Sequence, residues 1–289
     1  MTHEMDRRSV LALAGASLLP AIARAQDKAA AATPPGKRKL RQSVARWIYS
    51  EIPIDELCTK VKDMGITAID LLSANEWMVP KKHGLVCSMA FGPKSMQIGH
   101  GLNRLEHHDG FVKESEDIVP RIAEAGITNM IVFSGNRGGM DDATSIKNSI
   151  IGMQRMLPIA EKHGVTLCYE YLNSKVDHKD YQFDRMSLGL EVVKGAGSKF
   201  CKILYDIYHV QIMEGDIIRT MRDNIAHIGH FHTGGVPGRR DIDETQELNY
   251  PAICRAILET PYDGFVAHEF IPKKDKLETL ARCVKLCDV

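Results

Sequence analysis

Short runs of apolar and β-branched residues alternate along the chain with longer stretches in which apolar residues recur every three or four positions. A continuous apolar run of five to seven residues is typical of a strand that is buried on both faces of a parallel sheet. The longer stretches have the period of amphipathic helices, and several of them end in glycine, the usual residue after a helix. The predicted strands are residues 43–49, 68–72, 85–90, 129–134, 166–171, 201–206, 226–232 and 264–270.

The alternation of eight strands with helices predicts an α/β protein with the architecture of a (β/α)8 barrel, or TIM barrel. A doubly wound parallel sheet is the alternative, but no glycine-rich phosphate loop follows the first predicted strand. Pro120 and Pro158 fall inside two of the predicted helices, where proline disturbs the backbone hydrogen bonds. Residues 40–289 supply the length that a barrel of about 250 residues needs, so we expect one domain.

The first 39 residues have a different character. Arg7 and Arg8 form a pair that precedes an apolar stretch over 10–22, and Ala23-Arg24-Ala25 is an A-x-A cleavage site. Residues 1–25 therefore read as a signal peptide of the twin-arginine kind, which predicts a periplasmic protein. The apolar stretch is shorter than the ~20 residues of a membrane helix, and the alternative is an apolar first helix of the domain. Residues 26–39 read as a linker.

Charge and cysteine content narrow the classes of partner. The chain has 37 basic and 37 acidic residues, and no basic block lies outside the signal peptide and linker, which argues against nucleic acid as a partner. We expect a small-molecule substrate and no membrane span, and the sequence leaves room for a homo-oligomer. The 7 cysteines contain no C-x-x-C pair, and Cys283 and Cys287, on one predicted helix, are expected to be buried or idle thiols.

Four consecutive predicted strands carry a metal-ligand residue near the carboxyl end, where the active sites of such barrels lie. These residues are Glu170, Asp206, His232 and Glu269. Three carboxylates that converge without a cation repel one another, and a divalent ion removes the conflict. Oxygen ligands with one imidazole suit Mn²⁺, Mg²⁺ or Co²⁺. Taken singly, each acid could instead be a helix cap or an ion-pair partner, and the histidine a hydrogen-bonded core residue.

Two further residues are candidates for substrate binding. His209 follows Asp206 by three positions, and Arg239 follows a turn containing several glycines after the seventh predicted strand. A guanidinium there offers a fork for a carboxylate or a polyol, although a surface ion pair is the alternative. His230 shares the strand face of His232 but lies lower in the barrel, so we expect it to pack beneath the site and not to bind the metal.

The second half of the chain resembles the hydroxypyruvate isomerase family of the xylose-isomerase-like TIM-barrel superfamily. The resemblance rests on "YEYLNSKVDH", "LYDIYHVQIMEGD", "IGHFHTGGVPGRRDIDETQELNY" and "GFVAHEF", whereas the first half matches only in layout. It implies a divalent metal on the four strand-end residues, with Glu170 and Glu269 as the catalytic proton carriers. His209 and Arg239 would then hold the substrate.

The expected reaction is an aldose–ketose isomerisation of hydroxypyruvate and tartronate semialdehyde, or of a small sugar, through an enediolate. Two departures from the isomerase pattern keep other reactions open. Bacterial isomerases of the family often carry Gln at the position of His232, whereas the sugar epimerases of the superfamily carry His. The isomerases also usually have an acidic residue at the position of Gly235. The alternatives are a ketose 3-epimerase, a lyase or dehydratase acting on keto-sugars at the same metal site, and a non-catalytic sugar-binding protein of the cell envelope.

Overall fold

Eight parallel strands close into a barrel within residues 39–289, the part of the chain that this computed structural model describes. Neighbouring strands pair in chain order, and β8 pairs with β1 to complete the ring. The predicted signal peptide and nearly all of the predicted linker lie outside the described residues. The strands are β1 (Arg41–Ala45), β2 (Ala68–Leu72), β3 (Val86–Ala90), β4 (Asn129–Val132), β5 (Thr166–Glu170), β6 (Cys201–Asp206), β7 (Ile228–Thr233) and β8 (Phe265–His268).

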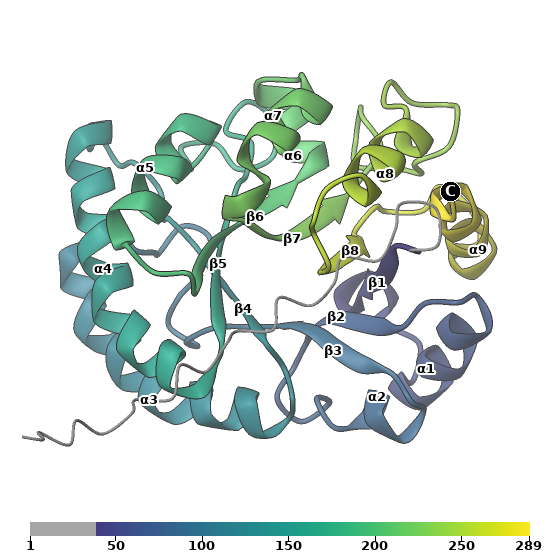
Figure 1. The fold of residues 1–289 in the computed structure, drawn as a ribbon, viewed down its shortest axis with the longest axis horizontal. Helices are drawn as coiled ribbons and strands as arrows, with labels where there is room; N and C mark the ends of the chain where they lie inside the picture. The colour runs from purple at the N-terminus through teal and green to yellow at the C-terminus, as the bar shows by residue number, and fades with distance from the viewer. Residues whose placement is uncertain (1–38) are drawn as a thin grey trace, which may run out of the picture. The chain divides into compact units, whose positions relative to one another are not determined.

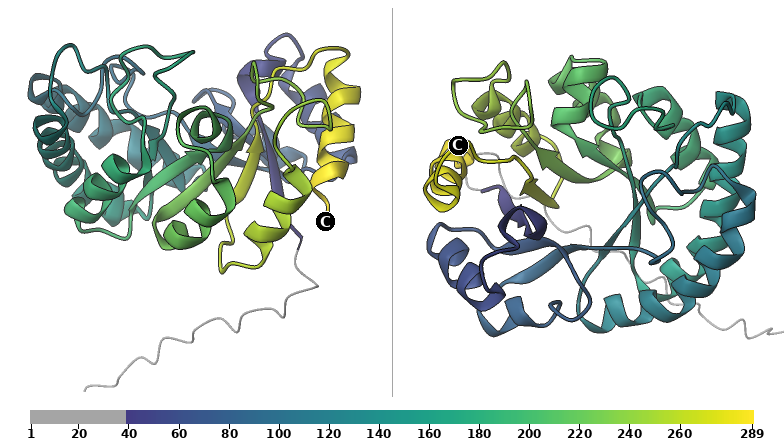
Figure 2. Two further views of the ribbon diagram at one scale, coloured as in Figure 1. Left: turned by 90° about the horizontal axis from the view of Figure 1, so that it is seen from above. Right: turned by 180° about the vertical axis from the view of Figure 1, so that it is seen from behind.

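Helices follow the strands and form an outer layer around them (Figure 1), and the view from behind shows the same ring (Figure 2). The TIM barrel predicted from the alternation is therefore confirmed. The helices are α1 (Ile54–Asp63), α2 (Val79–Lys82), α3 (His108–Glu124), α4 (Asp142–His163), α5 (Met186–Ala196), α6 (Ile207–Met213), α7 (Ile217–Asn224), α8 (Tyr250–Leu258) and α9 (Lys276–Cys287), with 3-10 turns η1 (Arg46–Tyr49), η2 (Leu105–His107) and η3 (Ile225–His227).

Strand positions agree closely with the apolar runs, with one informative difference. The first predicted strand, 43–49, ends early, because the backbone turns into η1 after Ala45. The turn takes Trp47 out of the strand and toward the mouth of the barrel, where its indole reaches Glu269. An apolar run alone cannot distinguish the last residues of a strand from a short 3-10 turn of the same composition.

Both prolines that fall inside predicted helices lie inside continuous helices of the structure. Pro120 is within α3 and Pro158 within α4. Proline removes one backbone hydrogen bond and frees the carbonyl of the residue four positions earlier. In α4 that residue is Gln154, and both it and Pro158 are exposed, so water can satisfy the freed carbonyl.

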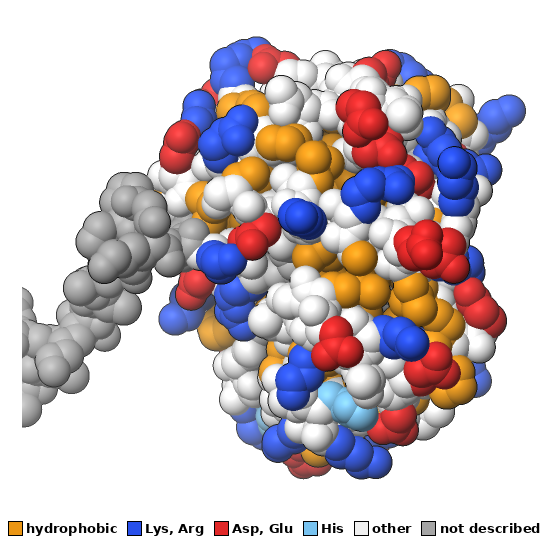
Figure 3. Space-filling model, turned by 90° about the vertical axis from the view of Figure 1, so that its right-hand side faces the viewer, with side chains coloured by type: hydrophobic (Ala, Val, Ile, Leu, Met, Phe, Trp, Pro, Cys, Tyr) orange, Lys and Arg blue, Asp and Glu red, His pale blue; other side chains and the backbone are white. Residues whose placement is uncertain are grey.

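The surface and the thiols agree with the composition. On the face drawn in Figure 3, acidic and basic side chains are interspersed and do not gather into a patch of one sign. No helix among residues 39–289 combines the length and the apolar character that crossing a membrane requires. The seven cysteines are free and buried, as expected for Cys283 and Cys287.

Replacing Gly189 by Ala is expected to destabilise the fold, although Ala is the better helix former. A β-carbon at Gly189 in α5 would lie 2.1 Å from Cζ of Phe183, whose ring stacks on Tyr169 with centroids 4.6 Å apart. Overpacking of this kind costs about 1–3 kcal/mol, more than the ~1 kcal/mol of helix propensity that Ala gains. Urea unfolding of the two proteins measures the difference.

Gly110→Ala, in the first turn of α3, is the matched control. The nearest heavy atom to its β-carbon would be 3.9 Å away, so the substitution should leave stability unchanged or raise it by up to ~1 kcal/mol. If Gly189→Ala proved as stable as the Gly110→Ala protein, tight packing of α5 against Phe183 would not be the reason for the glycine.

Candidate active site

The four predicted ligands meet at the carboxyl end of the barrel. Glu170 and Asp206 are the last residues of β5 and β6, His232 is the penultimate residue of β7, and Glu269 directly follows β8. The register pairs Asp206 with His232 across β6 and β7, which places them side by side. One ligand atom from each of the four lies within 4.8 Å of the others, and all four residues are buried.

His232 is the centre of this cluster. Its Nδ1 lies 2.7 Å from Oε2 of Glu269, 3.6 Å from Oε1 of Glu170 and 3.9 Å from Oδ2 of Asp206. The two longer distances exceed that of a hydrogen bond, and Nδ1 is a buried polar atom without a hydrogen-bond partner among the described residues. Such an atom, facing three carboxylates, fits a cation ligand better than a packed core histidine.

The three carboxyl groups of the cluster have pKa values that are shifted in different directions. Burial raises the pKa of Glu170 to about 7, and the nearby Glu269 charge adds to the rise. Burial also raises the pKa of Asp206, against the lowering effect of Arg239. Burial opposes the charge of Glu269 too, but Arg239 and His232 outweigh it and lower the pKa of that carboxyl to about 2. Three buried acids that cannot all ionise comfortably are what a bound divalent cation stabilises.

Asp206 has a second, structural task. Its Oδ1 accepts hydrogen bonds from the backbone N–H groups of Tyr208 at 2.8 Å and His209 at 3.2 Å, which caps α6. The helix cap proposed as the ordinary explanation for a strand-end acid is therefore present. Oδ2, however, faces His232 and Arg239, so one carboxylate serves both the helix and the cluster.

Arg239 reaches the cluster from the loop after β7. Its guanidinium contacts Glu269 and lies 3.3 Å from Oδ2 of Asp206, and its Nε has no hydrogen-bond partner among the described residues. The backbone at Arg239 has a positive φ of 57°, a conformation that most L residues avoid. The loop thus directs this side chain inward to the site, and the surface ion pair considered as an alternative is not what it forms.

His209 is placed differently from Arg239. It lies in α6 and is fully buried, with Nδ1 2.6 Å from Nδ2 of Asn173 and Nε2 3.7 Å from Oδ2 of Asp206. Burial, together with the charge of Arg239, holds its pKa well below the usual range, so the ring is neutral. It lies behind Asp206 and not along the cavity wall, where His178 lies instead. Its substrate-binding role stays a prediction.

A cavity of about 180 Å³ opens directly over the cluster. Its polar lining residues are Glu170, Glu269, Arg239 and His178, together with the ring of Trp47. Its apolar lining residues are Leu71, Phe91, Ile98, Ile131, Phe133 and Leu172, all but the last of which come from β2 to β4 and the segments that follow these strands. The lining therefore combines charged and apolar side chains.

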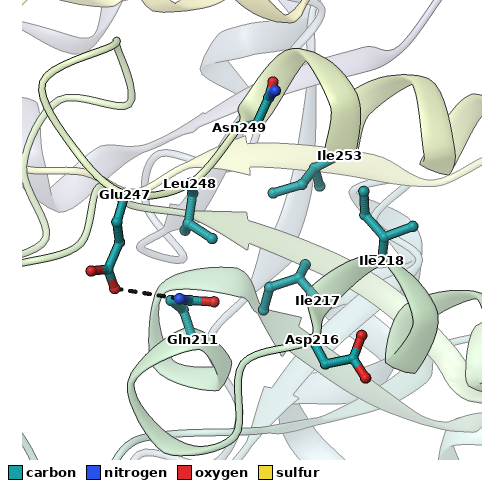
Figure 4. A pocket seen from close by; sticks show the side chains of 8 residues that line it. All are labelled: Gln211, Asp216, Ile217, Ile218, Glu247, Leu248, Asn249 and Ile253. Carbon is teal, nitrogen blue, oxygen red and sulfur yellow. Dashed lines mark hydrogen bonds between the residues drawn. The ribbon is translucent and has the colours of Figure 1, made fainter.

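A larger hollow of about 320 Å³ lies elsewhere, between α6, α7 and the start of α8 (Figure 4). Its polar side chains Gln211 and Glu247 are bonded to each other at 3.3 Å. None of the six predicted site residues lines it. Size alone would favour this hollow, but the convergent buried acids make the smaller cavity the candidate active site.

A model of the xylose isomerase-like TIM barrel family matches residues 56–287. The chain belongs to this family. The resemblance read from the second half of the sequence is confirmed, and it extends into the first half, which matches the family as well.

Curated relatives within the family carry isomerase names. The 2-oxo-tetronate isomerase of Cupriavidus necator is 36% identical over 114 residues, which is 39% of this chain and 43% of the relative. The hydroxypyruvate isomerase of Escherichia coli is 31% identical over 112 residues, again 39% and 43%. These matches span less than half of each relative. A 2-oxo-tetronate isomerase of Pectobacterium atrosepticum aligns over 78% of this chain and 89% of its own length, at 23% identity.

Solved structures agree on the fold. A structure described as an AP endonuclease of family 2 from Brucella melitensis has a TM-score of 0.75 at 21% identity, covering 84% of this chain and 98% of that one. A D-psicose 3-epimerase has a TM-score of 0.66 at 19% identity, covering 86% and 90%. At these identities the likeness concerns the barrel and not its reaction.

Three residues that contact the cluster or its cavity were not predicted from sequence. Trp47 donates from Nε1 to Oε1 of Glu269 at 2.6 Å, Asp70 lies 2.9 Å from Nε2 of His232, and His178 lines the cavity. A signal existed for Asp70, because it is a lone carboxylate inside the apolar run "AIDLL". The other two lie beyond strand ends, where sequence gives no direction for a side chain.

Proposed function

We propose that the chain is a metal-dependent isomerase that interconverts a small hydroxy-keto acid and its aldehyde isomer, of the hydroxypyruvate and tartronate semialdehyde type. The observation that carries the proposal is the placement of two glutamates, Glu170 and Glu269, around one buried point with Arg239 beside them. Binding alone needs no pair of proton carriers, so this arrangement also disfavours a non-catalytic sugar-binding role.

A divalent cation fits the cluster. Glu170, Asp206, Glu269 and Nδ1 of His232 would hold it, and the oxygen-rich donor set with one imidazole suits Mn²⁺, Mg²⁺ or Co²⁺. Bound there, it would supply the positive charge that stabilises an enediolate. The buried acids with opposed pKa shifts and the unpartnered Nδ1 are independent reasons to expect an ion at this point.

Besides holding the cation, the residues of the site would transfer protons and bind the substrate. An aldose–ketose isomerisation removes a proton from one carbon and delivers a proton to its neighbour, which two carboxylates on separate strands can do in turn. Glu170 ends β5 and Glu269 directly follows β8, so the two carboxylates would approach a substrate bound over the cluster from different strands. Arg239 can bind the substrate carboxylate in a two-pronged contact.

The cavity favours a small keto acid over a hexose. Its volume of about 180 Å³ is below the ~300 Å³ at the lower end of typical ligand pockets. Six of its lining side chains are aliphatic or phenylalanine residues, and substrate hydroxyls buried against them would lose their hydrogen bonds at about 1–3 kcal/mol each. The names of the Cupriavidus and Escherichia relatives agree with a three- or four-carbon substrate.

A ketose 3-epimerase is the second candidate, and His232 favours it, because the sugar epimerases resembled by this sequence carry histidine at that position. Incubation of the metal-loaded protein with hydroxypyruvate, tartronate semialdehyde and a panel of ketoses separates the two. We expect turnover of the keto acids to exceed turnover of the ketohexoses. A preference for ketohexoses would show that the epimerase is the better assignment. Loss of water from the substrate would indicate the keto-sugar lyase or dehydratase.

Arg239→Lys is expected to raise KM for the keto acid by about 10-fold, the effect of removing one well-aligned charged contact of ~1.4 kcal/mol. A lysine keeps the charge but cannot reproduce the planar, two-pronged contact with a carboxylate. Steady-state kinetics measure KM and kcat. Arg240→Lys, at the next residue and outside the cavity wall, is the control and should leave both constants unchanged. An unchanged KM in Arg239→Lys would remove Arg239 from the substrate site.

We also propose that the protein is exported to the periplasm by the twin-arginine route, on the strength of Arg7 and Arg8 and the stretch that follows them. The double substitution Arg7→Lys, Arg8→Lys is expected to retain the protein in the cytoplasm, as measured by cell fractionation and immunoblotting. Lys28→Arg, in the predicted linker, is the control and should be exported normally. Periplasmic protein in the double variant would show another route.

A further inference from the structure

Asp70 is a fully buried carboxylate that lies on the far side of His232 from the metal cluster. Its Oδ2 is 2.9 Å from Nε2 of His232, and its Oδ1 accepts a hydrogen bond of 2.5 Å from Oγ of Ser88. Nε2 of His230 lies 3.1 Å from the same Oδ1. A charged group with no access to water must have a purpose or a full set of partners, and here the partners include a metal-ligand candidate.

The backbone of β2 is distorted at this residue. The pairing of β2 with β3 shifts its register on both sides of Asp70, and the next residue, Leu71, has a positive φ of 54°. A regular strand sends neighbouring side chains to opposite faces. Here Asp70 contacts His232 inside the barrel, and Leu71 lines the cavity above it, so both point inward. The irregular backbone is what allows the carboxylate to reach His232.

The contact determines which nitrogen of His232 faces the cluster. A carboxylate accepts a hydrogen bond, so Nε2 carries the proton and donates it to Asp70. In the neutral ring that metal binding requires, Nδ1 is then the atom with a free lone pair, and it is Nδ1 that lies 2.7, 3.6 and 3.9 Å from the three acids. A carboxylate on the second ring nitrogen is the usual way in which proteins orient a metal-binding histidine.

We propose that Asp70 is a positioning residue that fixes the ring orientation and tautomer of His232, so that Nδ1 is the metal-binding atom. The proposal rests on the metal site of the proposed function and is independent of its substrate. Ser88 supports the carboxylate, and Oγ of Ser43 lies 2.6 Å from Oγ of Ser88, which continues the chain of hydrogen bonds toward β1. Asp70 therefore acts through His232 and has no contact with the cavity.

Calorimetric titration of the metal-stripped full-length protein with Mn²⁺ tests the proposal. Asp70→Ala and the nearly isosteric Asp70→Asn are expected to weaken Mn²⁺ binding by about 10–100-fold, with Ala the more severe. Ser88→Ala removes one hydrogen bond to Asp70 but leaves the contact with His232, and it should stay within about threefold of wild type. Circular dichroism identifies any variant that fails to fold, and Asp70→Asn keeps the test valid if Asp70→Ala does not fold.

A second readout distinguishes positioning from general loss of structure. In Mg²⁺-loaded protein with ¹⁵N-labelled histidine, the ring signals of His232, assigned by comparison with His232→Gln, should show the proton on Nε2. In Asp70→Asn at the same Mg²⁺ concentration, the sites that have lost the ion should show a mixture of the two tautomers, because no carboxylate holds the proton on Nε2. Unchanged Mn²⁺ affinity in a folded Asp70 variant would overturn the proposal. So would two equivalents of Mn²⁺ in wild type and one in Asp70→Ala, which would make Asp70, His230 and His232 a second metal site.

Discussion

Replacing Glu170 by Gln is expected to lower the turnover number by ~100-fold or more, the usual contribution of a general base. The amide keeps the shape of the side chain and an oxygen that can bind a cation, but it cannot carry a proton between carbons. Burial raises the pKa of Glu170 to about 7 in the metal-free protein, and a bound cation would lower it, which leaves the carboxylate ionised and able to accept a proton. Steady-state kinetics on the metal-loaded variant measure the effect.

Two controls accompany this measurement. Glu191→Gln, on the exposed surface of α5, makes the same chemical change away from the cavity and should leave turnover unchanged. Without metal, the melting temperature of Glu170→Gln should equal or exceed that of wild type, because the substitution removes a charge that burial disfavours. Full turnover in a metal-loaded Glu170→Gln protein would mean that Glu170 is a ligand only and that the proton moves by another group.

Asp206→Asn is expected to have opposite effects on the metal-free and the metal-loaded protein. Asn caps a helix as well as Asp does, so α6 keeps its N-terminal hydrogen bonds. Burial raises the pKa of Asp206, which means that the folded protein disfavours its charge, so the metal-free variant should be at least as stable as wild type. With a cation bound, the lost charge weakens the site.

Unfolding measured with and without Mn²⁺ checks both halves of this prediction. An ion at 100 times its dissociation constant stabilises a folded protein by about 2.7 kcal/mol, and wild type should show a gain of this order. At the same Mn²⁺ concentration the Asp206→Asn protein should show a much smaller gain and little activity, and a chelator should abolish the activity of wild type. Equal stabilisation of both proteins by Mn²⁺ would exclude Asp206 as a ligand.

The fold and the centre of the site were accessible from sequence because both depend on simple periodicity. A parallel barrel turns each buried strand into one apolar run and places all carboxyl ends at one mouth. Glu170, Asp206 and His232, each at or near the end of such a run, could therefore be brought together without coordinates. Glu269 lies one residue beyond β8 but directly follows the apolar run of that strand, so it could be placed with the other three.

What sequence could not supply was the direction of side chains where the backbone is irregular. Asp70 faces His232 because β2 is distorted at Leu71. The pattern of apolar residues does not predict a positive φ at a leucine. Trp47 reaches Glu269 because β1 gives way to a 3-10 turn. His209 is fully buried in the first turn of α6, and its predicted role in substrate binding stays a prediction.

Solvent isotope exchange tests the central claim most directly, namely that Glu170 and Glu269 move a proton between adjacent substrate carbons. Metal-loaded protein is incubated with hydroxypyruvate in D₂O, and deuterium on the carbon skeleton is followed by proton NMR. The account predicts incorporation that depends on protein and metal, exceeds the spontaneous rate, and falls to near that rate in Glu170→Gln. Conversion of hydroxypyruvate to its aldehyde isomer without any deuterium on carbon would contradict it.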